Sequence, residues 1–127
     1  MNYKDLKIWK LANEVSLEIH NMTLSLPNFE KYEIGSQIRR SSKSFKSNIV
    51  EGYGRKNYKA DLLKFLRYAL ASNDETLDHL DILFQTQSLK DEVLFFIALK
   101  NKIITLGKML LNFIKSVLKN HNKFYDR

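Results

Sequence analysis

The sequence predicts an all-α protein, an antiparallel four-helix bundle with up-down-up-down topology. Its 127 residues include only four Gly and one Pro, the residue types that punctuate strands and hairpins. Apolar residues recur mainly at three- and four-residue steps along four segments, which is the period of a helix with one buried face. The connections between these segments are short, so consecutive helices are expected to be antiparallel neighbours.

The first two helices are expected over residues 3–24 and 34–52. Pro27 follows the first helix, and a proline ring removes the backbone hydrogen bond that a continuing helix needs. Gly52 and Gly54 are expected to end the second helix. The apolar faces of the two segments are Leu6, Trp9, Val15, Ile19 and Met22, and Ile34, Ile38, Phe45 and Ile49.

The last two helices are expected over residues 57–87 and 90–119. The third helix carries one apolar stripe for eight turns, and its roughly 30 residues would span about 45 Å. The polar tail, residues 120–127, is expected to fray. The two apolar faces are Leu62, Leu66, Ala69, Leu77, Leu80 and Phe84, and Val93, Ile97, Ile104, Leu111, Ile114 and Leu118.

Length and composition narrow the class of protein. A chain of 127 residues has the size of one domain, so we expect a single bundle over residues 1–127. The absence of Cys excludes disulfides, thiolate zinc sites and a cysteine nucleophile. No apolar run approaches the roughly 18 residues of a membrane span, and residues 1–10 lack a signal peptide's apolar stretch. We therefore expect a soluble, cytoplasmic protein that does not bind membranes.

No pattern in the sequence indicates catalysis. Residues 52–54, Gly-Tyr-Gly, lack the Lys-Ser/Thr of a phosphate-binding loop, and Glu75 is not followed three residues later by the His of a di-iron motif. We expect no catalytic residues, no metal, no cofactor and no enzymatic activity. The three histidines are scattered over different segments and none has a second His at ligand spacing: His20, His79 and His121.

Positive charge is concentrated in two blocks of a chain whose formal net charge is +7. Residues 34–67 contain nine Lys/Arg against Glu51 and Asp61, and residues 100–127 contain seven against Asp126. A block this dense suggests a polyanionic partner, most often nucleic acid. The alternative is a solvated helix face on a modestly basic protein.

The basic residues form a stripe along the second helix and continue across the following turn. Tyr53 and Tyr58 lie among them, and such rings either stack on unpaired bases or pack the turn against the bundle. RNA or a DNA/RNA hybrid is the expected ligand in preference to duplex DNA, with little base specificity because no groove-reading motif is visible. The candidate nucleic-acid contacts are Arg39, Lys43, Lys46, Arg55, Lys56 and Lys59.

A polar seam runs beside the apolar stripe of the second helix, and Asn73 interrupts the leucine stripe of the third. Buried polar groups cost stability unless they are hydrogen-bonded, so a network that fixes helix register is one interpretation. The other is that these are boundary residues in contact with water. The candidate network consists of Gln37, Arg40, Asn48, Glu51, Asn73 and Glu75.

The apolar surface exceeds what one bundle core needs, which favours self-association over a thick monomer core. We expect the acidic half of the third helix, at Asp74, Asp78 and Asp81, to face a basic patch of a neighbouring copy. A closed assembly would carry one basic stripe per subunit. Several weak phosphate contacts on one particle would then bind a strand more tightly than one subunit does.

Several motifs resemble those of a known family, the 23S rRNA intervening-sequence proteins. They cover roughly residues 3–90: Leu6-x-x-Trp9-x-x-Ala12, Pro27-x-x-Glu30, Ser36-Gln37-Ile38-Arg39-Arg40, Ser44, Asn48-Ile49-Val50-Glu51-Gly52, Gly54-Arg55, Phe65-Leu66, Ala69, Ser72 and Glu75. The resemblance implies a bacterial four-helix bundle that assembles as a ring, commonly a homopentamer, with a largely unassigned function. A related branch, the accessory variability determinants of diversity-generating retroelements, is similar to a nucleic-acid-binding pentamer that works with a reverse transcriptase.

Together these observations predict a non-enzymatic, ring-like, pentameric protein that binds nucleic acid through repeated basic stripes. The alternative is an interaction scaffold or accessory subunit that holds a partner protein such as a polymerase or reverse transcriptase.

Overall fold

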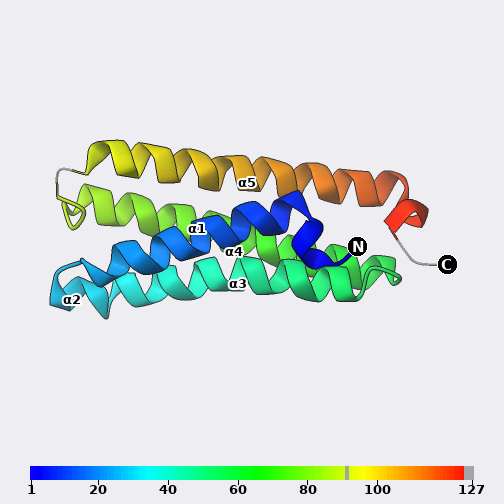
Figure 1. The fold of residues 1–127 in the computed structure, drawn as a ribbon, viewed down its shortest axis with the longest axis horizontal. Helices are drawn as coiled ribbons and strands as arrows, with labels where there is room; N and C mark the ends of the chain where they lie inside the picture. The colour runs from blue at the N-terminus through cyan, green and yellow to red at the C-terminus, as the bar shows by residue number, and fades with distance from the viewer. Residues whose placement is uncertain (91, 125–127) are drawn as a thin grey trace.

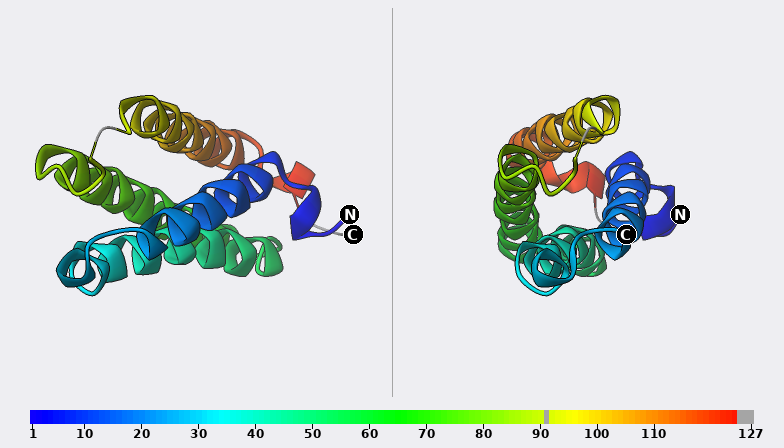
Figure 2. Two further views of the ribbon diagram at one scale, coloured as in Figure 1. Left: turned by 60° about the vertical axis from the view of Figure 1, so that its left-hand side comes forward. Right: turned by 90° about the vertical axis from the view of Figure 1, so that its left-hand side faces the viewer.

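Four long helices of alternating direction make up the bundle in the computed structural model, which describes residues 1–90 and 92–124 (Figure 1). They are α1 (Lys7–Leu24), α3 (Ile34–Gly54), α4 (Lys59–Gln85) and α5 (Val93–Lys119). Helices α1 and α4 each pack against both α3 and α5, so the chain goes up and down around the bundle (Figure 2). The predicted all-α, four-helix architecture is confirmed.

The core is formed by one face of each long helix. Phe45, Leu66 and Ile103, from α3, α4 and α5, are each at most 1% exposed, and Ile19 of α1 packs into the same cluster. These positions follow the three- and four-residue spacing of the sequence, which is why the pattern located the helices.

The helix ends differ from the predicted bounds where the chain makes a corner. The first helix begins at Lys7 rather than at residue 3, because residues Tyr3–Asp5 form a separate 3-10 turn, η1, and Leu6 is extended. Helix α4 ends at Gln85, since Gln87 adopts a left-handed φ of 62° and the amide of Ser88 donates to the carbonyl of Leu83. Lys90, with a φ of 54°, makes a second left-handed bend before α5 begins at Val93.

The described part of the tail, which the sequence predicts to fray, lies against the bundle. Residues His121–Phe124 form a short 3-10 helix, η2, and the ring of Phe124 lies 5.2 Å from that of Phe113. Packing an aromatic ring offsets the entropy of ordering the segment. Residues 125–127 of the predicted tail lie outside the described residues.

A buried carboxylate closes the corner between α1 and α3. The short helix α2 (Asn28–Lys31) brings in Glu30, whose carboxylate accepts from the amide of Ile34 at 3.2 Å and from the hydroxyl of Ser88 at 3.0 Å. A Cβ atom on Gly35 would stand only 2.8 Å from the carbonyl oxygen of Glu30. The corner therefore depends on the carboxylate of Glu30, which accepts from an amide at the start of α3, and on the absence of a side chain at Gly35.

Small residues let α3 and α4 approach each other closely. A Cβ atom on Gly52 would lie 3.2 Å from Cβ of Phe65, tighter than ordinary van der Waals contact. Further along the pair, the hydroxyl of Thr76 donates to that of Ser41 at 2.8 Å. This close pairing determines the shape of the polar surface described below.

Candidate nucleic-acid interface

One end of the bundle is strongly basic. The topology brings the start of α1, the end of α3, the start of α4 and the end of α5 together at the end where both termini lie (Figure 1). Residues 1–15, 44–72 and 106–124, hereafter the basic end, contain 13 Lys/Arg and four Asp/Glu. Residues 16–43 and 73–105, toward the other end, contain seven Lys/Arg and nine Asp/Glu in the sequence. The folded chain thus separates charge along its length.

The acids of the basic end are largely occupied by local contacts. Glu51 and Asp61 both pair with Arg55, at 2.9 and 3.4 Å, and Asp5 accepts from the backbone amide of Asn2. The hydrogen bond from Arg55 to Glu51, followed by that to Asp61, raises the pKa of the guanidinium. Exposed cations of the basic end that form no ion pair among the described residues are Lys4, Lys7, Lys10, Lys59, Lys64, Arg67, Lys108, Lys115, Lys119 and Lys123.

The predicted basic stripe on α3 has three different environments. The guanidinium of Arg39 donates to the carbonyl of Lys31 at 3.1 Å, so it fastens α2 to α3 instead of standing free. The ammonium of Lys46 lies 5.7 Å from the ring centre of Trp9, which leaves it half-buried beside α1. Lys43 is exposed.

The other three predicted contacts lie around the α3–α4 turn, within the basic end. Arg55 is neutralised by its two acids, as above. The ammonium of Lys56 stands 4.3 Å from the ring centre of Tyr53, and the carbonyl of Lys56 contacts the imidazole of His121 at 2.7 Å. Lys59 is exposed at the first residue of α4, next to Tyr58, which is 70% exposed.

The predicted contacts leave out basic residues at the start of α1, in the first half of α4 and at the end of α5, which the fold places at the same end of the bundle as Lys59. An up-down-up-down topology places the start of the first helix, the end of the second, the start of the third and the end of the fourth at one end of the bundle. The predicted contacts followed only the second helix and the turn after it. The cations of the basic end that are absent from the predicted contacts are Lys4, Lys7, Lys10, Lys64, Arg67, Lys108, Lys115, Lys119 and Lys123.

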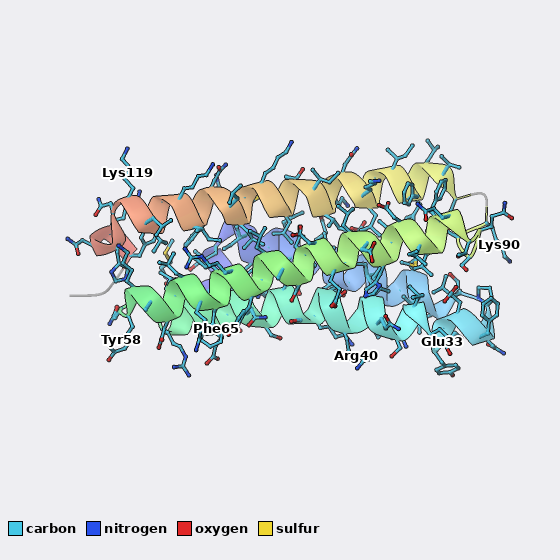
Figure 3. The ribbon with its side chains drawn as sticks, turned by 180° about the vertical axis from the view of Figure 1, so that it is seen from behind. Glu33, Arg40, Tyr58, Phe65, Lys90 and Lys119 are labelled. Atoms are coloured by element: carbon cyan, nitrogen blue, oxygen red, sulfur yellow. The ribbon has the colours of Figure 1, made fainter. Side chains whose placement is uncertain are left out.

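A polar hollow of about 490 Å³ lies between α3 and α4, on the side that Figure 3 shows with Arg40 labelled. Its centre is a chain of small polar groups: the amide of Asn48 donates to the hydroxyl of Ser44 at 3.2 Å, and this hydroxyl is 3.0 Å from that of Ser72. The residues lining the hollow are Gln37, Arg40, Ser41, Ser44, Ser72, Glu75 and His79.

The six residues of the predicted polar network do not form one network. Gln37, Arg40 and Glu75 meet around the hollow, and Asn48 reaches it through Ser44. Glu51 is exposed and binds Arg55.

The remaining member, Asn73, is 2% exposed and donates to the carbonyl of Ile103 at 3.1 Å. Its place on α4 faces α5 rather than α3, because positions 72 and 73 are one residue, about 100°, apart around the helix. Serine and threonine hydroxyls, not the predicted residues, make the bonds between α3 and α4.

An apolar stripe remains exposed along α5. Ile97, Leu111 and Leu118 are 42–48% exposed, and with half-buried Ile104 they recur every seven residues. We call this set together with Val93 the α5 stripe. A seven-residue apolar repeat is typical of a helix that packs along a second helix.

The acidic half of α4 differs from expectation at one position. Asp81 accepts from the ammonium of Lys100 at 2.9 Å in the same chain, so it does not stand free for a neighbouring copy. The antiparallel pairing of α4 and α5 places these two residues at the same level. Asp74 and Asp78 remain exposed.

The described residues show neither a cluster of metal ligands nor a membrane-spanning helix. Among residues 1–90 and 92–124, no group of three or more His, Asp or Glu side chains is arranged to hold a metal ion. No helix in that part of the chain combines the length and apolar character needed to span a membrane.

Comparisons with known proteins agree with the fold. The sequence model of a family described as "23S rRNA-intervening sequence protein" matches residues 4–112. A crystal structure of a protein of unknown function from the S23 ribosomal protein family of Bacteroides thetaiotaomicron VPI-5482 is similar, with a TM-score of 0.76 and 28% identity over 85% of this chain and 95% of that one. None of the curated proteins searched matches the chain.

Proposed function

The chain belongs to the 23S rRNA-intervening sequence protein family, and we propose that it is an oligomeric nucleic-acid-binding protein that acts by binding rather than by catalysis. Its ligand is RNA or a DNA/RNA hybrid, held by the basic end of the bundle. The single observation that carries this proposal is the excess of exposed, unpaired cations at that end.

Phosphate contacts supply the affinity. The acids of the basic end are occupied locally, so Lys59 and Lys119 have no competing carboxylate among the described residues. Each lysine that neutralises a phosphate releases condensed counterions, which favours binding at low salt.

The preference for RNA over duplex DNA rests on exposed aromatic rings. Tyr58 and Tyr68 are 70% and 51% exposed, beside the cations of α4. Such rings stack on unpaired bases, whereas paired bases inside a duplex are not available to them. A single-stranded or partly unpaired ligand therefore gains contacts that a DNA duplex does not.

Self-association would bring several copies of the weakly binding basic end together in one particle. The α5 stripe fits a helix of a second copy, since its repeat matches that of packed helices and its apolar side chains are otherwise left in water. A head-to-tail arrangement would close into a ring, and we propose a pentamer. Five basic ends on one particle would bind one strand with avidity that one subunit lacks.

The second candidate function is a scaffold that holds a partner protein such as a polymerase or reverse transcriptase. The α5 stripe is the observation that favours it, because a partner could cover that stripe in place of a second copy.

The experiment compares labelled single-stranded RNA, a DNA/RNA hybrid and duplex DNA of equal length by fluorescence anisotropy. We expect single-stranded RNA to bind more tightly than duplex DNA at every salt concentration. The hybrid should exceed duplex DNA only where it offers unpaired bases to Tyr58 and Tyr68. Equal or tighter binding of duplex DNA rejects the RNA preference. Absence of binding at low salt rejects the function and leaves the scaffold, which a stable complex with a partner polymerase would support.

A further inference from the structure

Arg40 and Glu75 border the same hollow from opposite helices without neutralising each other. Both line the hollow between α3 and α4, and both are exposed. Figure 3 labels Arg40 on α3. Among the described residues Arg40 has no ion pair, and the carboxylate of Glu75 meets only the imidazole of His79, at 3.9 Å. A cation on one wall and an anion on the other suit a ligand with acceptors on one edge and donors on another.

The floor of the hollow keeps one hydroxyl proton available. Ser44 and Ser72 share one bond, and the hydroxyl of Ser44 also accepts from Asn48. Two hydroxyls hold two protons, and their mutual bond uses one of them. The other can be donated to a ligand, so this pair adds a neutral donor between the two charged groups.

We propose that this hollow binds the base of an unpaired guanine in the nucleic-acid strand. Guanine presents the adjacent donors N1–H and N2–H₂ on its Watson–Crick edge, which match the two oxygens of the Glu75 carboxylate. Its O6 and N7 acceptors match the paired N–H groups of the Arg40 guanidinium. The site rests on the proposed function for the strand that brings the guanine to it.

Other ligands fit this arrangement less well. A phosphate group would be repelled by the carboxylate of Glu75, which lines the hollow. Adenine offers one donor group and an acceptor on its Watson–Crick edge, so the carboxylate would face a ring-nitrogen lone pair. Single-stranded nucleic acids are commonly read on these base edges, with neighbouring bases stacked on protein rings.

An exposed aromatic ring lies on the same edge of α4 as the hollow, toward the basic end. Tyr68, Ser72, Glu75 and His79 recur at steps of four, three and four residues, so they follow one edge of α4. Tyr68 is 51% exposed and lies about 10 Å from Glu75 along the helix axis, at 1.5 Å per residue. A strand from the basic end would pass Tyr68 before it reaches the hollow. This adds base specificity where the sequence predicted little.

The test measures the affinity of a uridine octamer that contains one central guanosine, inosine or adenosine. The Glu75→Gln and Arg40→Gln variants alter the hollow. Asp74→Asn removes the same charge as Glu75→Gln from an adjacent exposed position that does not line it. We expect the wild type and Asp74→Asn to prefer guanosine over adenosine by about tenfold, with inosine, which lacks the N2 amino group, in between. Both hollow variants should bind all three octamers equally.

Three results overturn the site. Equal affinity of the wild-type protein for all three octamers removes the guanine site but leaves the proposed function standing. Dissociation of the assembly by Arg40→Gln, measured by sedimentation, identifies the hollow as a contact between subunits. Preference for guanosine that survives Glu75→Gln shows that the base is read elsewhere.

A titration with guanosine 5′-monophosphate separates this inference from the proposed function. The amide resonances of Ser44 and Ser72 should shift with this nucleotide and not with adenosine 5′-monophosphate. If these resonances shift but no octamer binds, the guanine site is retained and the nucleic-acid-binding function is rejected. Unchanged resonances together with no binding of any octamer would reject both.

Discussion

The side-chain amide nitrogen of Asn73 lies 2.8 Å from the point that a Cβ atom on Gly107 would occupy. The same nitrogen donates to the carbonyl of Ile103, one turn earlier in α5, at 3.1 Å. Asn73 is 2% exposed, so this bond offsets part of the cost of a polar side chain in an otherwise apolar stripe, although the amide oxygen has no hydrogen-bond partner among the described residues. The contact holds α4 and α5 in register, because a shift along either helix would separate the amide from its carbonyl.

Whether Gly107→Ala raises or lowers the free energy of unfolding should depend on Asn73. Alanine favours the helix by about 1 kcal/mol over glycine, but its methyl group would displace the buried amide, at a cost of about 1–3 kcal/mol. We expect Gly107→Ala to lower the free energy of unfolding of the wild type and to raise that of the Asn73→Ala variant by about 1 kcal/mol. Urea unfolding of the four proteins measures this, and the same sign in both backgrounds would contradict the contact.

Replacing the buried acid Glu30 should loosen both corners at its end of the bundle. The Glu30→Ala variant removes the acceptors for the amide of Ile34 and the hydroxyl of Ser88, so the free energy of unfolding should fall by about 1–3 kcal/mol. The exposed neighbour Glu33 provides the control, and Glu33→Ala should change the free energy of unfolding by less than about 0.5 kcal/mol. Equal effects of the two substitutions in urea unfolding would show that the corner does not depend on this carboxylate.

The ion pair between α1 and α5 should stabilise the fold up to high pH. The hydrogen bond to Glu18 raises the pKa of Lys102 above its ordinary 10.5, so the folded protein holds this proton more tightly than the unfolded chain. The stabilisation that this ion pair provides is complete below pH 10.5 and is lost as the pH rises through the raised pKa of Lys102.

The Glu18→Gln variant tests this ion pair. It should be less stable than the wild type by under about 1 kcal/mol at neutral pH, because the pair is solvent-accessible. The difference should vanish at high pH. A difference that stays constant across the titration would assign the effect to packing.

Charges introduced into the α5 stripe should dissociate the assembly. We expect the double variant Ile97→Glu/Leu111→Glu to sediment as a monomer with unchanged helix content, since both side chains are exposed in the single chain. Thr105→Glu, at an exposed position about 100° around α5 from Ile104, should leave the assembly intact. An intact assembly of the double variant would place the interface between subunits on another face.

The helices were predictable because each is defined by a local pattern. Ile38, Phe45 and Ile49 mark the buried face of α3 by spacing alone, and all three are at most 1% exposed. The corners were not predictable in the same way. Gln87 takes a left-handed conformation that glycine usually supplies, so the end of α4 depends on the bonds made around it.

The positive charge of the candidate site was predictable from the sequence, but the arrangement of its side chains was not. The basic blocks are visible in the sequence, whereas the role of Arg39 depends on the carbonyl of Lys31, eight residues away in a helix that no periodicity indicates. The hollow beside Arg40 likewise exists only because Ser44 and Ser72 leave space between two helices. Side chains that are small and unremarkable in sequence become informative only after the helices are paired.

The most direct test of the nucleic-acid function is the salt dependence of affinity for a labelled single-stranded RNA. The logarithm of affinity should fall steeply with the logarithm of salt concentration. For the Lys59→Gln/Lys119→Gln variant the slope should be shallower by about 0.7 for each phosphate that the protein no longer neutralises. A variant with the same reduction of charge at the opposite end, Lys31→Gln/Lys90→Gln, should keep the wild-type slope. Equal slopes for all three proteins, or affinity that is insensitive to salt, would contradict binding by the basic end.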